Sequence, residues 1–361
     1  MPINIAINGF GRIGRAVFKI LTNTPNPRCI ISPVLTNADV EIVAINDLTD
    51  PETLAYLLKY DSVYGRSSLE IEGKSSKDKS VGGLKINGKV IPVLSEKNPE
   101  NLPWEKLDVD VVIESTGFFT NYQDANKHIT AGAKHVVISA PAKGDENENN
   151  STQVIGTDKT AMVFESGKSP SIVSNGSCTT NCVSSVTQAI ESAFGIEKAL
   201  MSTVHGYTST QNLVDGPNKK IRRARAAAVN IVPSSTGAAV ATTKVIPQLD
   251  GMFDGIAFRV PVPTGSVSDI TFVTKKKVTV NEVNDALTKA SSSPLFKNVL
   301  LTSNESLVSS DIIGMYYSAI VDLEYTKVAG GNLVKVVAWY DNEWGYSNRL
   351  AEMSLNLGKS I

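Results

Sequence analysis

The segment SNGSCTTNC, residues 174–182, holds the residue types that nucleophilic catalysis requires. Cys178 stands where small polar residues meet a helix-like run that extends from Thr179 to about Phe194. A thiolate at a helix N-terminus is favoured by the helix dipole and by unpaired backbone N–H groups. We therefore expect Cys178 to be a nucleophile.

His205 is the histidine best placed to act as the base of that thiol. It lies in MSTVHGYTSTQ, where a strand runs out into a loop rich in Gly and Thr. An imidazole at a strand end can approach a thiol at a helix start, which is the Cys/His arrangement of covalent catalysis. Taken by itself, a loop histidine with local hydrogen bonds is the simpler interpretation.

The remaining cysteines and histidines fit structural roles. Cys182 follows Cys178 by four residues, which is not the CxxC spacing of a redox or zinc motif, so we expect no metal. Cys182 and Cys29 suit buried cysteines. His128 lies in a predicted helix and His135 at a strand entrance, and we interpret both as structural.

Several Arg and Thr residues in the second half could bind anions. Arg259 is the most specific candidate, because an arginine inside the apolar strand GIAFRVPV requires an anionic partner. Thr208 follows His205 closely, and PSSTGAA puts Thr236 and Gly237 at a helix start. Together with the basic run KKIRRAR, these residues could hold two phosphates.

Gly9, Gly11 and Gly14 form the pattern GxGxxG directly after a strand and at the start of a helix. The first glycine permits the turn, the second lets the backbone approach a pyrophosphate, and the helix N-terminus supplies N–H groups. Asp47 closes the second strand, where a carboxylate accepts the ribose hydroxyls of NAD and repels the 2′-phosphate of NADP. It lies 33 residues after Gly14 because a loop rich in Pro and Asn intervenes. The pattern predicts NAD as cofactor; the alternative is that the glycines serve only tight strand–helix packing.

Elements of the first half alternate between strand and helix, which predicts an α/β fold with a Rossmann-type, doubly wound parallel sheet. Expected strands cover residues 3–7, 40–47, 109–115 and 135–141, and expected helices cover 13–21 and 122–131. In LKINGKVIPV, Asn87 and Gly88 predict a two-residue hairpin turn with positive φ. The polar stretch 144–152 predicts a solvated loop.

The second half has a different pattern. Segments such as SVSDITFVT alternate apolar and polar residues, which predicts a second, α+β catalytic domain with a mostly antiparallel sheet. The final segment, NEWGYSNRLAEMSLNLG, is amphipathic. We expect an NAD-binding domain over 1–177, completed by a C-terminal helix at 343–361, and a catalytic domain over 178–342.

Composition limits the function classes. At roughly 150 residues per domain, a chain of 361 residues suits two domains. A formal charge of -1 gives no global attraction to nucleic acid or anionic membranes. Three cysteines fit a reducing compartment, and no segment approaches the ~18 apolar residues of a membrane helix. We expect a soluble, cytoplasmic protein, while an organelle-resident variant stays open.

Several long motifs, in order, make the chain resemble the phosphorylating glyceraldehyde-3-phosphate dehydrogenases over essentially its full length. They are INGFGRIGR, ESTGFFT, VVISAP, SNGSCTTNC, TVHGYT, PSSTGAA, FRVPV and WYDNEWGYSNR. The resemblance implies NAD-dependent oxidation and phosphorylation of D-glyceraldehyde 3-phosphate to 1,3-bisphosphoglycerate through a cysteine thiohemiacetal and thioester. It also implies a homotetramer whose substrates are this aldehyde and inorganic phosphate, with no membrane and no obligate nucleic acid as partner.

The resemblance also implies a role for individual residues. Cys178 would be the nucleophile and His205 the base. The two phosphates would be held by Ser177, Thr179, Thr208, Thr236, Gly237, Arg259 and Arg223. NAD would be held by Gly9, Gly11, Arg12, Ile13, Gly14, Asp47, Ser139 and Asn342, the last of which would fix the nicotinamide carboxamide.

The chain departs from the family pattern at a few positions. Gly176 stands where Ala is usual, and Lys220 lies near where some members have Asp. Insertions at about 23–39, 67–84 and 144–151 resemble those of some longer members, including organelle-resident ones.

Two rival functions remain open at this point. Erythrose-4-phosphate and semialdehyde dehydrogenases also pair a cysteine with a dinucleotide fold, although STGAA and the two-phosphate set favour the triose phosphate. A non-enzymatic NAD-sensing or RNA-binding scaffold could use the basic loop at 218–225. The presence of Cys178, His205 and Asn342 together argues against that alternative.

Overall fold

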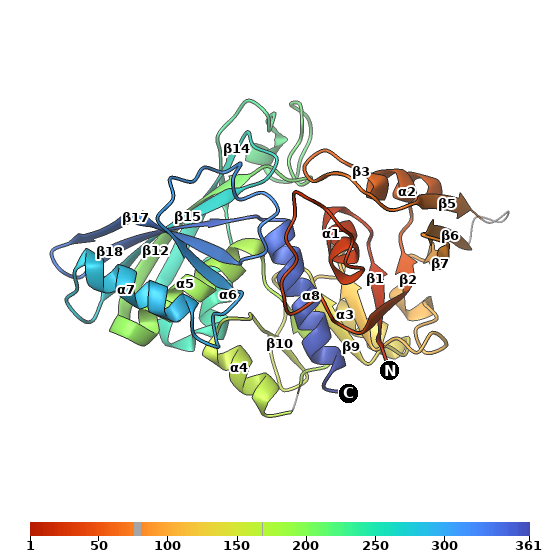
Figure 1. Cartoon of the computed structure of the whole chain (residues 1–361), viewed down its shortest axis with the longest axis horizontal. Coiled ribbons are helices and arrows are strands. Elements are labelled where there is room, and N and C mark those ends of the chain that lie inside the picture. The colour runs from red at the N-terminus through yellow and green to blue at the C-terminus, as the bar shows by residue number, and fades with distance from the viewer. Residues whose placement is uncertain (76–80, 168) are drawn as a thin grey trace. The chain divides into compact units, whose positions relative to one another are not determined.

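The computed structural model describes residues 1–75, 81–167 and 169–361, and the chain forms two compact units (Figure 1). Unit 1 consists of Met1–Gln153, Met162–Gly176 and Ser347–Ile361. Unit 2 consists of Val154–Ala161 and Ser177–Tyr346. Part of the insertion expected at 67–84 lies outside the described residues.

Unit 1 contains a nine-stranded sheet with the order β10-β11-β9-β8-β1-β2-β7-β6-β5. Its strands are β1 (Ile3–Asn8), β2 (Val40–Asn46), β5 (Ile71–Ser75), β6 (Val81–Ile86), β7 (Lys89–Leu94), β8 (Val111–Glu114), β9 (His135–Ile138), β10 (Asn150–Thr152) and β11 (Ile172–Ser174). All pairs from β10 to β7 are parallel, and the pairs β7-β6 and β6-β5 are antiparallel. The predicted Rossmann-type parallel sheet is confirmed, with an antiparallel extension at one edge.

The central strands of this sheet are buried along their length, as expected for a parallel sheet covered on both faces. A short ribbon, β3 (Tyr60–Asp61) with β4 (Gly65–Arg66), lies outside it. The helices associated with the first half and the C-terminus are α1 (Arg12–Leu21), α2 (Pro51–Lys59), α3 (Tyr122–Thr130), α4 (Asp158–Glu165) and α8 (Trp344–Gly358). In each βα unit the carboxyl end of the strand leads into a turn at one edge of the sheet, which is where ligands of such folds bind.

The predicted hairpin joins β6 to β7. Asn87 and Gly88 have φ values of 46° and 88°, as the two central residues of a tight hairpin turn require. The register pairs Ile86 with Lys89 directly across the turn. The predicted hairpin is therefore confirmed. It could be predicted from the sequence because turn chemistry depends only on neighbouring residues.

Unit 2 contains a seven-stranded sheet with the order β13-β14-β12-β15-β18-β17-β16. Its strands are β12 (Ile196–Gly206), β13 (Val232–Ser235), β14 (Phe253–Val260), β15 (Ser266–Thr274), β16 (Leu300–Ser303), β17 (Ala319–Ala329) and β18 (Leu333–Tyr340). Four of the pairs are antiparallel, while β12-β14 and β16-β17 are parallel, so the mostly antiparallel sheet is confirmed. Helices α5 (Cys178–Phe194), α6 (Ala238–Val245) and α7 (Val280–Ser291) belong to this unit.

Two expectations from the sequence are wrong in detail. The stretch 144–152 is not only a loop, because its last residues form β10, which pairs with β11 through backbone hydrogen bonds that hydropathy does not report. Cys182 is buried as expected, but Cys29 is half-buried, since it lies in the loop between α1 and β2. Among the described residues, no helix is long and apolar enough to cross a membrane.

Candidate functional site

Cys178 is the first residue of α5, and Ser177 caps that helix. Ser177 Oγ accepts a hydrogen bond from the Thr180 N–H at 3.0 Å, which secures the first turn. Gly176 has a φ of 61°, so a glycine instead of alanine suits this backbone position. The cap leaves the thiol at the positive end of the helix.

The structure brings His205 to this thiol. His205 Nε2 lies 3.3 Å from Cys178 Sγ, and the imidazole is 3% exposed at the end of β12. His205 Nδ1 lies 2.7 Å from the Gly206 carbonyl oxygen. Nε2 is therefore the ring nitrogen that faces the sulfur, while Nδ1 faces the backbone. This is the geometry of a thiol and its general base.

Burial opposes ionisation of both groups. It raises the pKa of the Cys178 thiol, while the charge of Arg259 is the largest opposing influence. Burial also lowers the pKa of His205 to about 3, and Arg259 acts in the same direction. His205 is therefore neutral near pH 7.

Arg259 and Arg223 form a cationic cluster beside the imidazole. Arg259 Nη1 lies 2.7 Å from His205 Nδ1. Arg223 Nη1 donates to Thr210 Oγ1 at 2.9 Å, and Thr210 Oγ1 lies 2.8 Å from Thr208 Oγ1. The Nε atoms of both arginines are buried without a partner among the described residues. Burial and the charge of Arg259 both lower the pKa of Arg223. Two neighbouring cations with unpaired donors are arranged for an anion.

Sequence reasoning missed Tyr340, the last residue of β18. Its hydroxyl lies 2.9 Å from Thr179 Oγ1 on α5 and 2.8 Å from Thr203 Oγ1 on β12. Its ring meets the imidazole of His205 edge-on, with centroids 6.0 Å apart. Tyr340 thereby joins the two elements that carry the thiol and the imidazole. No spacing in the sequence signals a contact between residues this far apart.

Other predicted residues of unit 2 lie at element ends. Gly237 is the N-cap of α6, and Thr236 Oγ1 accepts a hydrogen bond from the Ala238 N–H at 3.2 Å. A Cβ added at Gly237 would meet nothing within 4 Å. Asn342 follows β18 and is 5% exposed. The phosphate-binding role of Thr236 and Gly237 stays a prediction.

In unit 1, the three glycines of the GxGxxG pattern have different surroundings. A Cβ added at Gly9, whose φ is 93°, would lie 2.6 Å from Thr116 N, and one added at Gly14 would lie 2.2 Å from the Gly9 carbonyl oxygen. A Cβ added at Gly11 would meet nothing within 4 Å, and no side chain caps α1 there. Tight packing therefore explains Gly9 and Gly14 but not Gly11. Open space at an uncapped helix N-terminus fits a pyrophosphate.

Asp47 directly follows β2 and is half-buried. Its Oδ2 accepts from the Phe10 N–H at 2.7 Å, and its Oδ1 accepts from the Thr49 N–H at 2.9 Å. These bonds hold the carboxylate at the carboxyl edge of the sheet and leave lone pairs for ribose hydroxyls.

Arg12 and Ile13 form the first turn of α1, and Ser139 directly follows β9. Both terminal nitrogens of Arg12 lie 3.3 Å from Asp61 Oδ1, and the guanidinium lies over the Tyr64 ring. Since this side chain is engaged within the protein, the backbone N–H of Arg12 is the better candidate for a contact with NAD.

A groove at this edge of the unit 1 sheet contains Gly9, Gly11 and Asp47. Its further lining residues are Asn8, Asn46, Leu48, Glu96, Lys97, Ser115, Thr116, Phe118 and Phe119. The sequence analysis assigned no role to ESTGFFT, residues 114–120, which begins at the last residue of β8, the parallel neighbour of β1. Ligands of such folds bind outside the carboxyl ends of parallel strands, so this segment could have been predicted to line the groove.

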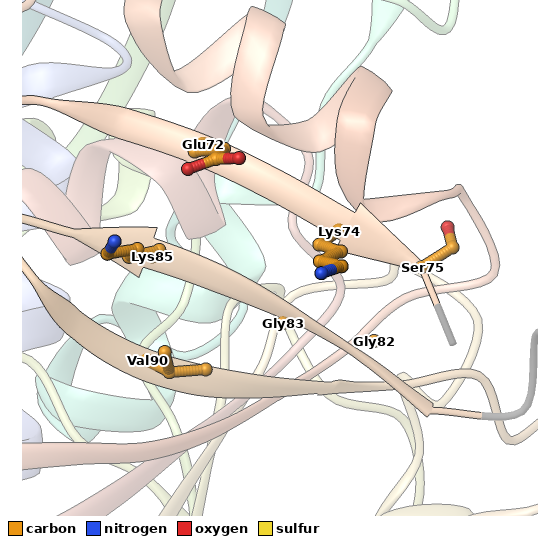
Figure 2. A pocket seen from close by; sticks show the side chains of 7 residues that line it. All are labelled: Glu72, Lys74, Ser75, Gly82, Gly83, Lys85 and Val90. Carbon is orange, nitrogen blue, oxygen red and sulfur yellow. The ribbon is translucent and has the colours of Figure 1, made fainter. Parts of the chain in front are cut away.

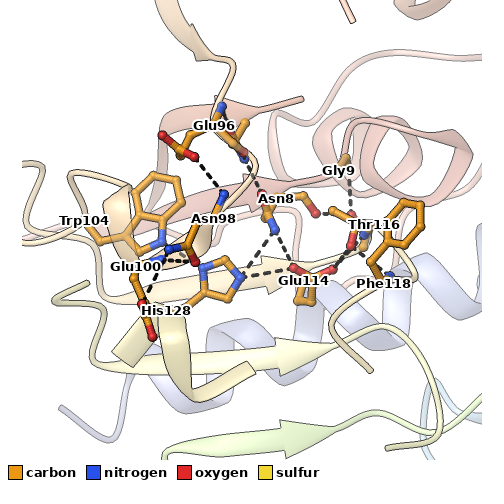
Figure 3. A network of polar contacts seen from close by, with 12 residues as sticks. Asn8, Gly9, Glu96, Asn98, Glu100, Trp104, Glu114, Thr116, Phe118 and His128 are labelled. Carbon is orange, nitrogen blue, oxygen red and sulfur yellow. Dashed lines mark hydrogen bonds and ion pairs between the residues drawn. The ribbon is translucent and has the colours of Figure 1, made fainter. Parts of the chain in front are cut away.

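A buried polar network holds Thr116 in the wall of this groove (Figure 3). Trp104 Nε1 donates to His128 Nδ1 at 3.0 Å, and because an indole N–H can only donate, the imidazole carries its proton on Nε2. That Nε2 lies 3.1 Å from Glu114 Oε2, which also accepts from Asn8. Glu114 Oε1 accepts from the Thr116 N–H at 2.9 Å and from its hydroxyl. These contacts support the structural role expected for His128.

A second cavity of unit 1 lies over β5, β6 and β7 (Figure 2). It is lined by Glu72, Lys74, Ser75, Gly82, Gly83, Lys85 and Val90, none of which is a predicted site residue. Within the described ranges, no group of three or more His, Cys, Asp or Glu side chains is arranged to hold a metal ion.

Comparisons with known proteins show which family the chain resembles. A family model described as the NAD binding domain of glyceraldehyde 3-phosphate dehydrogenase matches residues 3–122, and a model described as its C-terminal domain matches residues 177–342. The chain is 47% identical to a glyceraldehyde-3-phosphate dehydrogenase of Streptomyces coelicolor over 361 residues, covering 100% of both chains. It is 46% identical to the enzyme of that name from Mycolicibacterium smegmatis over the same span, and 46% identical to one from Geobacillus stearothermophilus over 356 residues, 98% of each chain.

Proposed function

Because the chain belongs to the glyceraldehyde-3-phosphate dehydrogenase family, we propose that it oxidises and phosphorylates D-glyceraldehyde 3-phosphate to 1,3-bisphosphoglycerate with NAD. The observation that carries this proposal is the 3.3 Å contact between Cys178 Sγ, at the start of α5, and His205 Nε2. A nucleophilic thiol with a neutral base in contact is what acyl chemistry on an aldehyde requires.

The two side chains act in sequence. The Cys178 sulfur adds to the aldehyde carbon while its proton passes by way of His205 Nε2 to the aldehyde oxygen, which becomes the hydroxyl of a thiohemiacetal. His205 Nε2 accepts the proton of the thiohemiacetal hydroxyl, which allows the carbon to become a thioester. NAD, when bound, supplies the hydride acceptor. The backbone N–H of Cys178 can stabilise the developing oxyanion, a role worth a few kcal/mol.

The cationic cluster serves the phosphates. We assign the substrate phosphate and inorganic phosphate to Arg259 and Arg223, supported by their unpaired buried Nε atoms. The hydroxyl and backbone contributors would be Ser177, Thr179, Thr208, Thr236 and Gly237. Inorganic phosphate held there attacks the thioester, and the thiolate of Cys178 leaves as the acyl phosphate forms.

In unit 1, the groove is the proposed site of the pyrophosphate and a ribose of the cofactor. In unit 2, Asn342 is proposed to bind its carboxamide. The pyrophosphate would lie at Gly11 and the N–H groups of Arg12 and Ile13, and the ribose would lie at Asp47, supported by the open space at Gly11. Gly9, Gly14 and Ser139 would shape the same site. This assignment treats 1–177 with 343–361 as the NAD-binding domain and 178–342 as the catalytic domain.

A homotetramer is part of the proposal. Its support in this chain is an apolar face on the unit 2 sheet: Leu200 is 66% exposed and Val204 36% exposed on β12, and Ile256 is 48% exposed on the adjacent β14. Clustered apolar side chains on a surface indicate a protein interface. A cytoplasmic location suits an enzyme whose nucleophile must stay reduced.

One assay tests the proposed activity. Wild-type protein with glyceraldehyde 3-phosphate and NAD should form NADH continuously when phosphate is present and should stop after a single turnover when it is omitted. Cys178→Ser should abolish NADH formation while NAD binding survives. Sustained turnover by Cys178→Ser would overturn the assignment.

The same assay distinguishes the alternatives. A faster rate with erythrose 4-phosphate than with the triose phosphate would favour the related dehydrogenase. RNA binding without any turnover would favour a scaffold, and RNA that NAD fails to displace would exclude a shared site.

A further inference from the structure

The side-chain amide of Asn342 is held in one orientation by two hydroxyl groups. Asn342 Oδ1 lies 2.9 Å from Ser266 Oγ, at the start of β15, and 3.2 Å from Thr264 Oγ1. Ser266 and Thr264 are each 1% exposed. In such a buried setting, each polar atom has few choices of partner.

The proton positions follow from a backbone donor. The Gly206 N–H donates to Ser266 Oγ at 3.2 Å, and an amide N–H cannot accept. The single proton of Ser266 is therefore left for Asn342, whose facing atom must be the carbonyl oxygen. If the amide were reversed, Ser266 would face two donors and its own proton would lose its acceptor.

The opposite side of the amide is available to a ligand. Asn342 Nδ2 has no hydrogen-bond partner among the residues that the structure describes, and it is not one of the buried polar atoms left unsatisfied. Its two N–H groups are therefore not fully sealed from solvent. An amide nitrogen offers only donors, so the atom it recognises must be an acceptor such as a carbonyl oxygen.

We infer that Ser266 is a positioning residue, clamped between the Gly206 N–H and Asn342 Oδ1, which turns the donor side of Asn342 toward the carboxamide oxygen of NAD. The inference rests on the proposed function, which assigns Asn342 to that carboxamide. Because Gly206 follows His205 in the chain, the same hydroxyl also ties the carboxamide anchor to the strand end that carries the base. Ser266 itself need not touch cofactor or substrate.

Calorimetric titration with NAD and with ADP-ribose tests this role, because ADP-ribose lacks the nicotinamide. Ser266→Ala should weaken NAD binding by about 3- to 12-fold, as expected for one lost hydrogen bond of a preorganised donor. Binding of ADP-ribose should not change. A variant that was merely destabilised would lose affinity for both ligands.

A double-mutant cycle identifies the residue through which Ser266 acts. In an Asn342→Ala background, Ser266→Ala should cause no further loss of NAD affinity. The matched control is Ser268→Ala: Ser268 is also buried on β15, two residues along on the same side, but its Oγ contacts Thr203 Oγ1 at 3.3 Å. Ser268→Ala should bind NAD like the wild type.

Three results would overturn the inference: unchanged NAD affinity in Ser266→Ala, an equal loss of ADP-ribose affinity, or a full effect that persists without Asn342. Failure of the wild type itself to bind NAD would contradict the proposed function and the inference with it. NAD binding by the wild type together with any of the three results would contradict the inference alone.

Discussion

At the scale of single residues, Arg259 acts on both partners of the reactive pair. Its charge opposes the effect of burial on the pKa of the Cys178 thiol, and it adds to the effect of burial on the pKa of His205. One cation thus favours the thiolate and keeps the imidazole unprotonated. Since Arg259 is also proposed to bind phosphate, anion binding and thiol reactivity are coupled through this side chain.

Replacing Arg259 tests the effect of its charge on the Cys178 thiol apart from its proposed role in binding phosphate. In Arg259→Leu, the thiolate of Cys178 loses a stabilising positive charge, so the pKa of the thiol rises and alkylation by iodoacetamide needs a higher pH. We expect the midpoint of the rate against pH, measured without phosphate, to move to higher pH. Arg225→Leu is the matched control, because Arg225 pairs with Asp215 at 2.8 Å on the surface. An unmoved midpoint in Arg259→Leu would show that the charge does not act on the thiol.

At the scale of elements, two turns of different kinds carry the site. The turn from β1 into α1 is built by glycines that allow close packing at one position and leave open space at another. The turn from β11 into α5 presents a thiol at a capped helix start. Both turns lie at the carboxyl ends of parallel strands, where side chains from neighbouring elements converge.

The glycines of α1 give a prediction at this scale. Gly11→Ala should leave the melting temperature near that of the wild type, since the new methyl has room, but it should weaken NAD binding by about tenfold or more because it occupies the space for the pyrophosphate. Gly14→Ala should instead destabilise the protein by about 1–3 kcal/mol, because its Cβ meets the Gly9 carbonyl oxygen. Thermal unfolding and calorimetry measure both. Unimpaired NAD binding by Gly11→Ala would contradict the location of the pyrophosphate.

At the scale of the whole molecule, unit 2 exposes an apolar face. Along β12 the residues alternate: Met201 and Thr203 are buried, while Leu200 and Val204 point outward. An exposed apolar stripe of this kind on a sheet face indicates burial against another chain.

Charges on that face should disrupt assembly. Leu200→Glu combined with Ile256→Glu should lower the mass in light scattering from that of four chains to that of two or one, because burying two carboxylates in an apolar interface is costly. Met162→Glu, at an exposed position on α4, should keep the wild-type mass. A double variant that still has the mass of four chains would place the interface elsewhere.

Local chemistry decided which features the sequence could predict. The glycine turn after β1, the Asn87–Gly88 hairpin and the thiol at the start of α5 depend on neighbouring residues, and the sequence predicted all three. The contact of Cys178 with His205 was predicted from the ends of their elements. Three contacts were not predicted, because each joins residues that only the folded sheet brings together. They are the hydrogen bonds of the Tyr340 hydroxyl, the hydrogen bond of Ser266 to Asn342 and the network of Glu114 with His128.

The central claim is that Cys178 carries the acyl group. Its most direct test is the mass of the intact chain after mixing with NAD and glyceraldehyde 3-phosphate in the absence of phosphate, followed by acid quench and peptide mapping. We predict one NADH per chain and a gain of one phosphoglyceroyl group, located on Cys178 and released by added phosphate. An unchanged mass despite NADH formation, or an acyl group on another residue, would contradict the account.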